Sequence, residues 1–226
     1  MTGDRTIISW NLLHRSGATL EQIKGLVAGN APDLLLLQEA TAAIDALPFE
    51  IGGYYVRNAL PGRAHGLATW SPLPLAHPPS TLALPPGMLV RRICQLVDLG
   101  DFTVANVHLS HGQLLNRRQL RRIARALPTS AAIIGDCNML GPSLLLGFHD
   151  VGPRQPTHAA GAVLPLRLDR CLVRGLRCVG AEALNRGDSD HRPILVRLST
   201  GGGGRKGRRS AACVVSDSAA DRRQCR

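Results

Sequence analysis

Short apolar runs alternate with two helix-like segments along most of the chain. The runs are rich in Leu, Ile, Val and Ala and are separated by polar residues and turns, which is typical of buried strands. We expect strands at residues 6–10, 33–37, 66–70, 90–99, 102–108, 131–135, 166–173 and 192–198. Because these strands are short and evenly distributed, the pattern favours a mixed α/β fold with extensive antiparallel pairing.

Two segments have the spacing of helices instead. We expect helices at residues 19–28, where Thr19 suits the N-cap position, and at residues 113–127. The apolar face of the second helix is expected to contain Leu114, Leu115, Ile123 and Leu127. Arginines fill much of the remaining surface: Arg117, Arg118, Arg121, Arg122 and Arg125. Such a surface is more often solvated than used to contact nucleic acid, and both interpretations stay open.

Prolines and glycines mark the loops and one boundary. Residues 73–80 and 84–87 contain too many prolines for central strands. Four consecutive glycines begin at Gly201. They separate residues 1–199, which we expect to form one domain, from a basic, glycine-rich tail at residues 200–226, which we expect to be disordered. No repeat of about 20–50 residues is visible, which argues against solenoids and propellers.

Composition predicts one large core and gives a weak electrostatic signal. The chain has 226 residues, of which 44% are apolar and 19% charged, whereas aromatic residues make up only 3%. The formal net charge is +11, but residues 201–226 hold seven Lys or Arg and two Asp or Glu, which leaves +6 for the body. Charge alone therefore indicates a polyanionic partner only weakly.

Several classes of protein lack a signal in the chain. No apolar run approaches the ~20 residues that span a bilayer, and no secretory segment precedes the first strand, so we expect a cytoplasmic, monomeric protein without a membrane span. The six cysteines form no CxxC pair, so neither a zinc site nor a disulfide framework is indicated. P-loop, GxGxxG and GxSxG motifs are absent, which leaves nucleotide-cradling and serine-hydrolase functions unsupported.

Polar residues follow the apolar strands at several places, where a rim of strands would present them to one cleft. The strongest pair is Asp136 and Asn138, two residues apart at the end of the strand at residues 131–135. Alternate residues of an extended chain share a face. A carboxylate there can activate a water, and an amide can stabilise charge on a phosphoryl group. An Asx turn is the structural alternative for the same residues.

Two further strand ends suit a hard divalent cation. Glu39 leaves an apolar run that is expected to be buried on both faces, and Asn11 follows the first strand. Magnesium usually takes one or two protein carboxylates and keeps several waters, so sparse and separated oxygen ligands are expected. Taken singly, either residue is more often an ordinary surface residue.

Histidines supply the ionisable groups near neutral pH. Asp190 and His191 precede the last strand, and Asp169 is a candidate for holding the His191 tautomer. His108 is a second candidate acid. The other histidines are interpreted as structural or exposed: His14, His65, His77, His111, His149 and His158. His108 and His111 form an HxxH pair, but a spacing of three along a strand would turn the rings to opposite faces, so zinc is not expected there.

Taken in order, these motifs resemble the endonuclease/exonuclease/phosphatase superfamily, which has the deoxyribonuclease-I-like fold. The resemblance covers about residues 5–198 and also includes the strand at residues 66–71 and the segment at residues 189–194. Each motif is short, so its specificity comes from joint order and spacing. The resemblance implies an α/β (α+β) fold: a four-layer α/β/β/α sandwich of two packed, mostly antiparallel sheets flanked by helices, with the site at one rim.

The resemblance also implies a role for each polar residue. Glu39 would be the main ligand for Mg²⁺, or for Mn²⁺ as the alternative, with support from Asn11 and Asp190. Asp136 would activate the attacking water and Asn138 would hold the phosphate. His191, oriented by Asp169, would stabilise the phosphate charge or act as the base, and His108 would be the acid for the leaving group. Asn106 would support the site. Independently of the resemblance, Arg91, Arg92 and the arginine-rich helix are candidates for contacting a phosphate backbone.

The predicted function is hydrolysis of phosphodiesters, with nucleic acid as the leading substrate. The alternatives are a phosphomonoesterase, a lipid-headgroup phosphodiesterase, or an inactive module that binds nucleic acid. Two features depart from the family pattern: Cys137 replaces a bulky apolar residue, and only about 26 residues separate Glu39 from Gly66. Because such connections normally carry substrate-recognition loops, the short chain implies a small or open substrate site.

Overall fold

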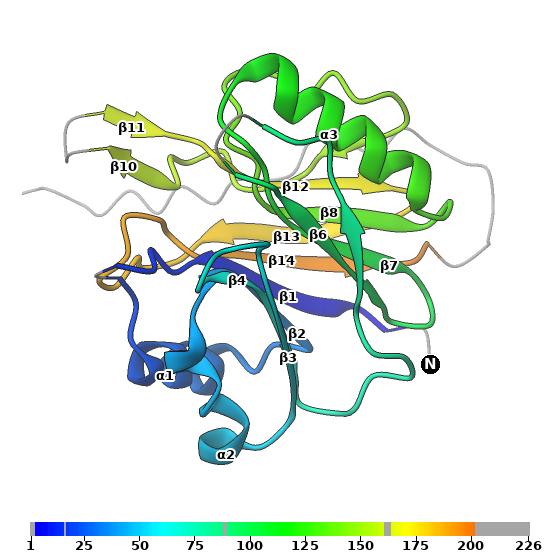
Figure 1. The fold of residues 1–226 in the computed structure, drawn as a ribbon. Coiled ribbons are helices and arrows are strands. Elements are labelled where there is room, and N and C mark those ends of the chain that lie inside the picture. The colour runs from blue at the N-terminus through cyan, green and yellow to red at the C-terminus, as the bar shows by residue number, and fades with distance from the viewer. Residues whose placement is uncertain (1–2, 16, 88–89, 161–163, 202–226) are drawn as a thin grey trace, which may run out of the picture.

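Two six-stranded sheets pack face to face, with helices on both outer surfaces. The computed structural model describes residues 3–15, 17–87, 90–160 and 164–201. Helices α1 (Leu20–Asn30) and α2 (Leu47–Ile51) lie beyond one sheet, and α3 (Gln113–Ala126) lies beyond the other (Figure 1). The predicted four-layer sandwich is therefore confirmed.

The first sheet has the strand order β13-β14-β1-β2-β4-β3. Its strands are β1 (Arg5–Asn11), β2 (Leu34–Ala40), β3 (Tyr54–Ala59), β4 (Gly66–Ser71), β13 (Arg177–Ala183) and β14 (Ile194–Ser199). All neighbours are antiparallel except β1 and β2, which are parallel, with Asn11 opposite Gln38. Because parallel strands end at the same edge, Asn11 and Glu39 leave the sheet side by side.

The second sheet has the order β5-β6-β7-β8-β12-β9. Its strands are β5 (Ser80–Ala83), β6 (Ile93–Asp98), β7 (Thr103–His108), β8 (Ala131–Asp136), β9 (His149–Asp150) and β12 (Asp169–Arg174). Only β7 and β8 are parallel. Asp136 stands opposite His108 on one side and opposite Asp169 on the other. This register brings three predicted site residues into one row at the sheet edge.

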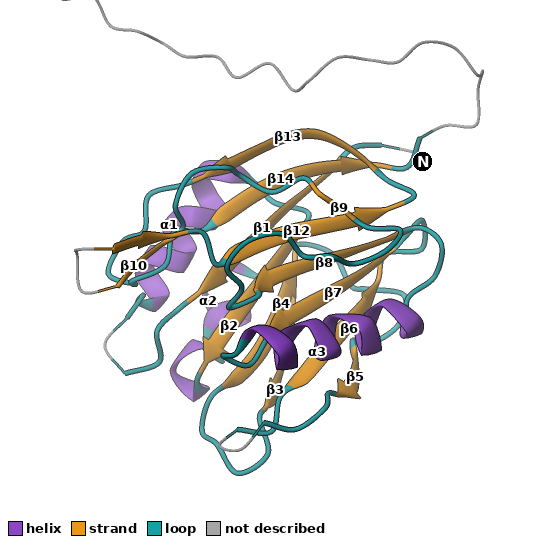
Figure 2. Ribbon diagram, turned by 90° about the horizontal axis from the view of Figure 1, so that it is seen from above, coloured by secondary structure: helices purple, strands orange, loops and turns teal. Residues whose placement is uncertain are grey.

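A separate hairpin of β10 (His158–Ala160) and β11 (Leu164–Leu166) extends from the end of the molecule where these predicted site residues lie (Figures 1 and 2). In the view from above, α3 crosses the outer face of the second sheet (Figure 2). A short 3-10 helix (Ala42–Ile44) follows β2. No helix within the described ranges is long and apolar enough to cross a membrane.

The apolar core has three layers, and β2 shows how one strand serves two of them. Leu34 and Leu36 lie in the cluster between the sheets, whereas Leu35 and Leu37 pack toward α1. Side chains alternate along a strand, so an unbroken run of leucines is what a strand buried on both faces requires. Each of these leucines is 0% exposed, and truncating one to alanine would cost about 2–5 kcal/mol.

The helices form for local reasons that are visible in the sequence. Thr19 caps α1 as predicted: its hydroxyl accepts from the Gln22 backbone N–H, and the Gln22 side chain accepts from the Thr19 N–H. The predicted apolar face of α3 is wrong for Leu114, which is 82% exposed. Ile123 and Leu127 are buried as predicted, whereas the burial of Leu120 and of two amides, Asn116 and Gln119, was not expected.

All eight predicted strands contain an observed strand, but their ends differ. The strand expected at residues 90–99 begins only at Ile93, and the one at residues 166–173 is interrupted between β11 and β12. Strands β3, β5, β9, β10 and β13 were not expected. β5 lies at an edge of its sheet, where nearby prolines are tolerated. The domain boundary near residue 199 stays a prediction, because nearly all of the tail lies outside the described residues.

Candidate active site

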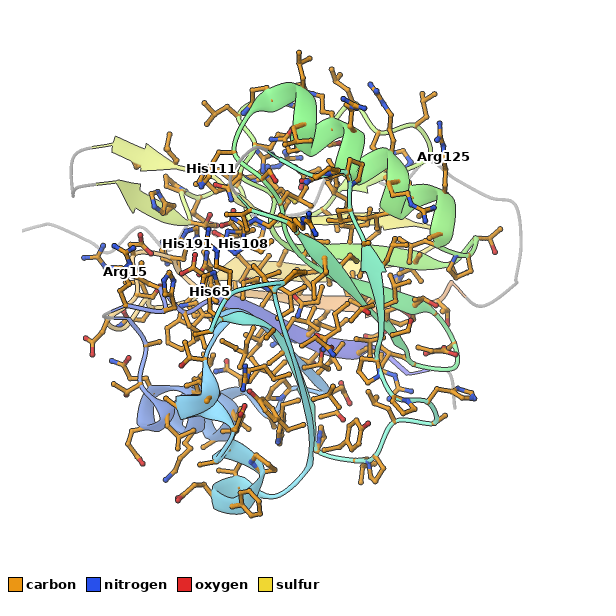
Figure 3. All side chains as sticks on the ribbon, in the orientation of Figure 1. Arg15, His65, His108, His111, Arg125 and His191 are labelled. Atoms are coloured by element: carbon orange, nitrogen blue, oxygen red, sulfur yellow. The ribbon has the colours of Figure 1, made fainter. Side chains whose placement is uncertain are left out.

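A cleft of about 390 Å³ opens where the ends of β1, β2, β7, β8 and β12 meet. It is lined by Asn11, Leu13, Glu39, His108, His111, Gly112, Gln113, Asp136, Asn138, Leu140, His158, Leu166, Leu168, Asp190 and His191. Figure 3 shows His108 and His191 together between the two sheets. Of the predicted site residues, only Asp169, Asn106 and Arg91 are not part of this lining.

Asp136 is the centre of the hydrogen-bond network. One carboxylate oxygen, Oδ2, accepts from the side-chain amides of Asn11 (3.0 Å) and Asn138 (3.2 Å), and Oδ1 accepts from the Asn138 backbone N–H (2.9 Å). The carboxylate is 1% exposed. Burial raises its pKa, and the nearby His191 charge offsets only part of that rise. A carboxylate with a raised pKa is a stronger proton acceptor once it is ionised.

The backbone before Asp136 explains why glycine precedes it. Gly135 has φ +141°, and a Cβ there would lie 2.1 Å from the carbonyl oxygen of Val107 on the parallel strand β7. Only glycine tolerates both the positive φ and this close approach. Its absence of a side chain lets β8 lie close to β7, where His108 stands opposite Asp136.

His191 is held in one orientation by contacts on both sides. Its Nδ1 hydrogen-bonds Asp169 Oδ2 at 2.8 Å, and its backbone N–H donates to the Ser189 hydroxyl. Burial alone would lower the pKa of His191, but Asp169 and Asp136 outweigh that effect and raise it to about 10. Nε2 is left pointing toward Asp136 Oδ2, 3.8 Å away. The geometry thus presents a cationic imidazole edge to the cleft.

His108 occupies a different electrostatic environment. Its Nε2 lies 3.3 Å from Asp136 Oδ2 and its Nδ1 lies 3.9 Å from Glu39 Oε1. Burial, together with the charge of Arg92, holds the pKa of His108 well below its usual range. The ring is therefore neutral at pH 7 and can donate one hydrogen bond.

Glu39 reaches the cleft because it sits on a β-bulge. Gln38 pairs with Leu67 and Ala40 pairs with Gly66, so Glu39 is the extra residue, with φ +57°. A bulge re-aims one side chain without breaking the sheet. His14 donates its backbone N–H to Glu39 Oε2 at 3.0 Å and its ring contacts the same oxygen. Burial would raise the pKa of Glu39, but these His14 contacts more than offset it, so the pKa is lowered.

The oxygen donors in the cleft fit a hard divalent cation. The carboxylates of Glu39 and Asp190 line the same cleft as Asn11. Asp190 Oδ1 is buried and has no hydrogen-bond partner among the described residues, so a lone pair is available there. Oxygen ligands, two carboxylates and space for water are what Mg²⁺ and Mn²⁺ require.

Two predicted site residues use their polar side-chain atoms in hydrogen bonds within the protein. The two amide hydrogens of Asn138 are directed to Leu109 O and Asp136 Oδ2, so this side chain positions Asp136 in the present arrangement. Asn106 is 0% exposed: its Oδ1 accepts from Gln38, and its Nδ2 donates to Ala68 O at 3.0 Å. Asn106 therefore supports the site from behind and does not line the cleft.

The arginine pair before β6 has one exposed and one buried member. Arg91 is exposed, whereas Arg92 is 7% exposed and its Nε and Nη1 lack hydrogen-bond partners among the described residues. Burial lowers the pKa of Arg92 despite the opposing charges of Asp136 and Glu39. The only sequence signal was the Arg-Arg pair before β6, and the strand's true start at Ile93 decides which arginine is buried.

Three histidines interpreted as ordinary also belong to this region. His14 contacts Glu39, and His111 and His158 line the cleft. The expectation that His108 and His111 point to opposite faces is wrong, because β7 ends at His108 and His111 lies in the following loop. The spacing of His108 and His111 could not predict that both line the cleft, because side chains alternate between faces only within a strand.

Comparisons with known proteins agree with this architecture. The family model described as the endonuclease/exonuclease/phosphatase family matches residues 8–191. This range runs from β1 to His191 and contains every residue placed in the cleft. No curated protein matches the chain by sequence.

Solved structures share the fold at low sequence identity. An endonuclease/exonuclease/phosphatase from Bacteroides vulgatus has a TM-score of 0.73 and 16% identity, covering 88% of this chain and 99% of that one. One from Beutenbergia cavernae DSM 12333 has a TM-score of 0.66 and 18% identity, covering 88% and 72%. TDP2 from D. rerio, in a structure described as complexed with a single-strand DNA product, has a TM-score of 0.66 and 16% identity, covering 88% and 100%.

Proposed function

The chain belongs to the endonuclease/exonuclease/phosphatase family, and from this premise we propose that it is a divalent-metal-dependent hydrolase of phosphate esters, with phosphodiesters as the main substrates. One observation carries the proposal. Asp136 faces the rings of both His108 and His191 in a single cleft, and the ionised Glu39 lines the same cleft. A base, a cationic phosphate contact and a metal ligand are thereby combined.

Glu39 would hold the metal, with Asn11 and Asp190 as its other protein donors. We propose Mg²⁺, with Mn²⁺ as the alternative, because all three donors are oxygens. The bound cation would supply Lewis acidity and neutralise charge on the phosphate. The contacts from His14 keep Glu39 ionised and fix one of its oxygens.

The remaining steps are carried by protein side chains. Asp136, oriented by Asn11 and Asn138, accepts the proton of the water that attacks phosphorus. His191, oriented by Asp169, hydrogen-bonds a phosphate oxygen and stabilises the negative charge that develops. His108 has the role of a neutral hydrogen-bond donor to the leaving oxygen, because its pKa is lowered by burial.

Nucleic acid is the proposed substrate class. The body of the chain carries +6 by sequence, and Arg92, which the charges of Asp136 and Glu39 reach, has an Nε and an Nη1 without hydrogen-bond partners in the part of the chain that the structure describes. Charge of this sign favours a phosphate backbone. The D. rerio TDP2 structure with a single-strand DNA product shows that this fold can hold such a ligand. With aromatics at 3% of the chain, recognition through the backbone is more plausible than base stacking.

The test is hydrolysis of bis-p-nitrophenyl phosphate and of a single-stranded DNA oligonucleotide with Mg²⁺. We expect turnover that EDTA abolishes, and we expect Asp136→Ala to reduce it by about 10²–10⁴-fold, the contribution of a positioned base. Unchanged activity in that variant would overturn the assignment. Salt-sensitive DNA binding with no turnover at any divalent metal would instead identify an inactive binding module.

A lipid-headgroup phosphodiester is a second candidate, favoured by exposed leucines, one of which lines the cleft. Leu140 lines the cleft and is 53% exposed, and Leu114, Leu144 and Leu146 are exposed by 82%, 69% and 95%. Exposed leucines beside a basic helix are typical of surfaces that meet a membrane interface. A panel of DNA, a phosphomonoester and phospholipid vesicles, each at the same Mg²⁺ concentration, decides between the substrates by relative kcat/KM.

A further inference from the structure

Three side chains at one wall of the cleft form a group with the geometry of a metal site. His158, Asp190 and His191 each offer a ligand atom, and these atoms all lie within 4.8 Å of one another. His158 and His191 are paired across an antiparallel bridge, and the Arg192 N–H donates to Thr157 O beside them. The backbone therefore fixes both histidines opposite each other, one from the start of β10 and one from the segment before β14.

One distance within the group matches the separation of two zinc ligands. His158 Nε2 lies 3.4 Å from Asp190 Oδ2. Two ligands of a tetrahedral ion with bonds of about 2.0–2.1 Å lie roughly 3.4 Å apart. The rings of His158 and His191 have centroids 4.5 Å apart and planes tilted by 58°.

His191 is already arranged as histidine ligands are. Its Nδ1 hydrogen-bonds Asp169, which leaves Nε2 as the ligand atom, and a carboxylate behind the ring is the common partner of metal-bound histidine. Asp190 Oδ1 is also buried without a hydrogen-bond partner among the described residues, and such an atom is costly unless a ligand or water satisfies it.

We propose that His158, Asp190 and His191 bind a nitrogen-preferring ion of the Zn²⁺ type, and that this ion inhibits the enzyme. Two imidazoles suit zinc and not magnesium, whose ligands are oxygens. The ion would occupy His191 Nε2 and Asp190, which the reaction needs free for phosphate and for Mg²⁺. The inhibitory effect rests on the proposed function, whereas the binding itself does not.

The binding test uses the full chain without a histidine tag and Co²⁺ as the spectroscopic probe. We expect visible d–d absorption of a four-coordinate ion, displaced by Zn²⁺, with no thiolate band from the cysteines. His158→Gln should weaken binding by more than about 10-fold, since losing even an outer-shell partner costs 10–100-fold. Glu39→Gln is the matched control and should keep the spectrum. Absent binding, a thiolate band, or unchanged affinity in His158→Gln would each overturn the site.

The activity test adds Zn²⁺ to the Mg²⁺-supported hydrolysis of bis-p-nitrophenyl phosphate. We expect inhibition in the wild type and more than about 10-fold weaker inhibition in His158→Gln, each measured relative to the same protein's rate without zinc, and the thermal midpoint of the variant should match the wild type. Equal inhibition in both proteins would overturn the inhibitory role. If the chain hydrolyses no phosphoester, the proposed function fails while the cobalt titration still decides the metal site.

Discussion

Two groups of buried polar residues lie between the sheets, and they differ in charge and in access to the cleft. The rim cluster consists of Glu39, His108, Asp136, Asp169 and His191. The amide network consists of Ser9, Gln38, Thr69, Gln95 and Asn106. In the amide network neutral groups mostly pair with one another: Gln38 donates to Ser9 and Asn106, and Gln95 accepts from Thr69 at 2.7 Å. In the rim cluster all five residues are ionisable, and all but Asp169 line the cleft.

The difference shows how one fold uses buried polarity for two purposes. Neutral polar groups that largely satisfy one another cost little to bury, and within the described residues only Gln38 Oε1 of this network lacks a partner. Charged groups that face an open cleft are expensive to bury, and burial and neighbouring charges shift their pKa values in different directions. The amide network is therefore expected to control stability, and the rim cluster is expected to control activity.

The largest effect is expected from Asp169→Asn in the rim cluster. The amide cannot hold the His191 cation as the carboxylate does, so kcat for a phosphodiester should fall by about 10²–10⁴-fold. The far-ultraviolet circular dichroism spectrum should stay unchanged. Retained activity would show that His191 needs no orienting partner and would remove Asp169 from the mechanism.

The matched change in the amide network is Asn106→Ala. It removes one hydrogen-bond partner each from Gln38 and Gln95 inside the core, so the free energy of unfolding should fall by about 2–4 kcal/mol. Urea unfolding measures this loss, and kcat measured at low temperature should change by less than about threefold. A large loss of kcat at unchanged stability would contradict the division between the two groups.

The pH dependence of stability sharpens the comparison further. The pKa of His191 is raised to about 10 in the folded protein, above an unfolded value of about 6.5. The contribution of protonated His191 to the free energy of unfolding is therefore fully present below pH ~6.5. It is lost as the pH rises toward 10, at up to about 1.4 kcal/mol per pH unit. Urea unfolding in EDTA should show this slope in the wild type and a flatter one in His191→Gln. Equal slopes would contradict the ion pair with Asp169.

The smallest effect is expected from the two neighbouring arginines. Arg92→Gln should raise KM for a diester by about 10-fold, the value of one charged hydrogen bond. Arg91→Gln is the exposed control and should change KM by less than about twofold. Initial rates over a range of substrate concentrations measure both variants. A larger increase in KM for Arg91→Gln than for Arg92→Gln would instead identify Arg91 as the phosphate contact.

Much of this architecture is visible in the sequence, and the parts that are not have physical reasons. The run at Leu34–Ala40 and the strand before Asp136 stand out because alternation and burial act within a few residues. His158 does not, because its short hairpin contains Pro165 and shows no two-residue period. The burial of Arg92 and the exposure of Leu114 depend on where β6 begins and how α3 rotates, which tertiary packing decides.

A Mg²⁺ titration of phosphodiester hydrolysis, run on the wild type and on Glu39→Gln, tests the central claim most directly. If the rim cluster is a metal-dependent active site, EDTA abolishes the wild-type rate. Mg²⁺ then restores it in a saturable way, and Glu39→Gln requires at least about 10-fold more Mg²⁺ for half-maximal activity. A wild-type rate that persists in EDTA, or the same Mg²⁺ requirement in both proteins, would contradict the assignment of Glu39 as the metal ligand.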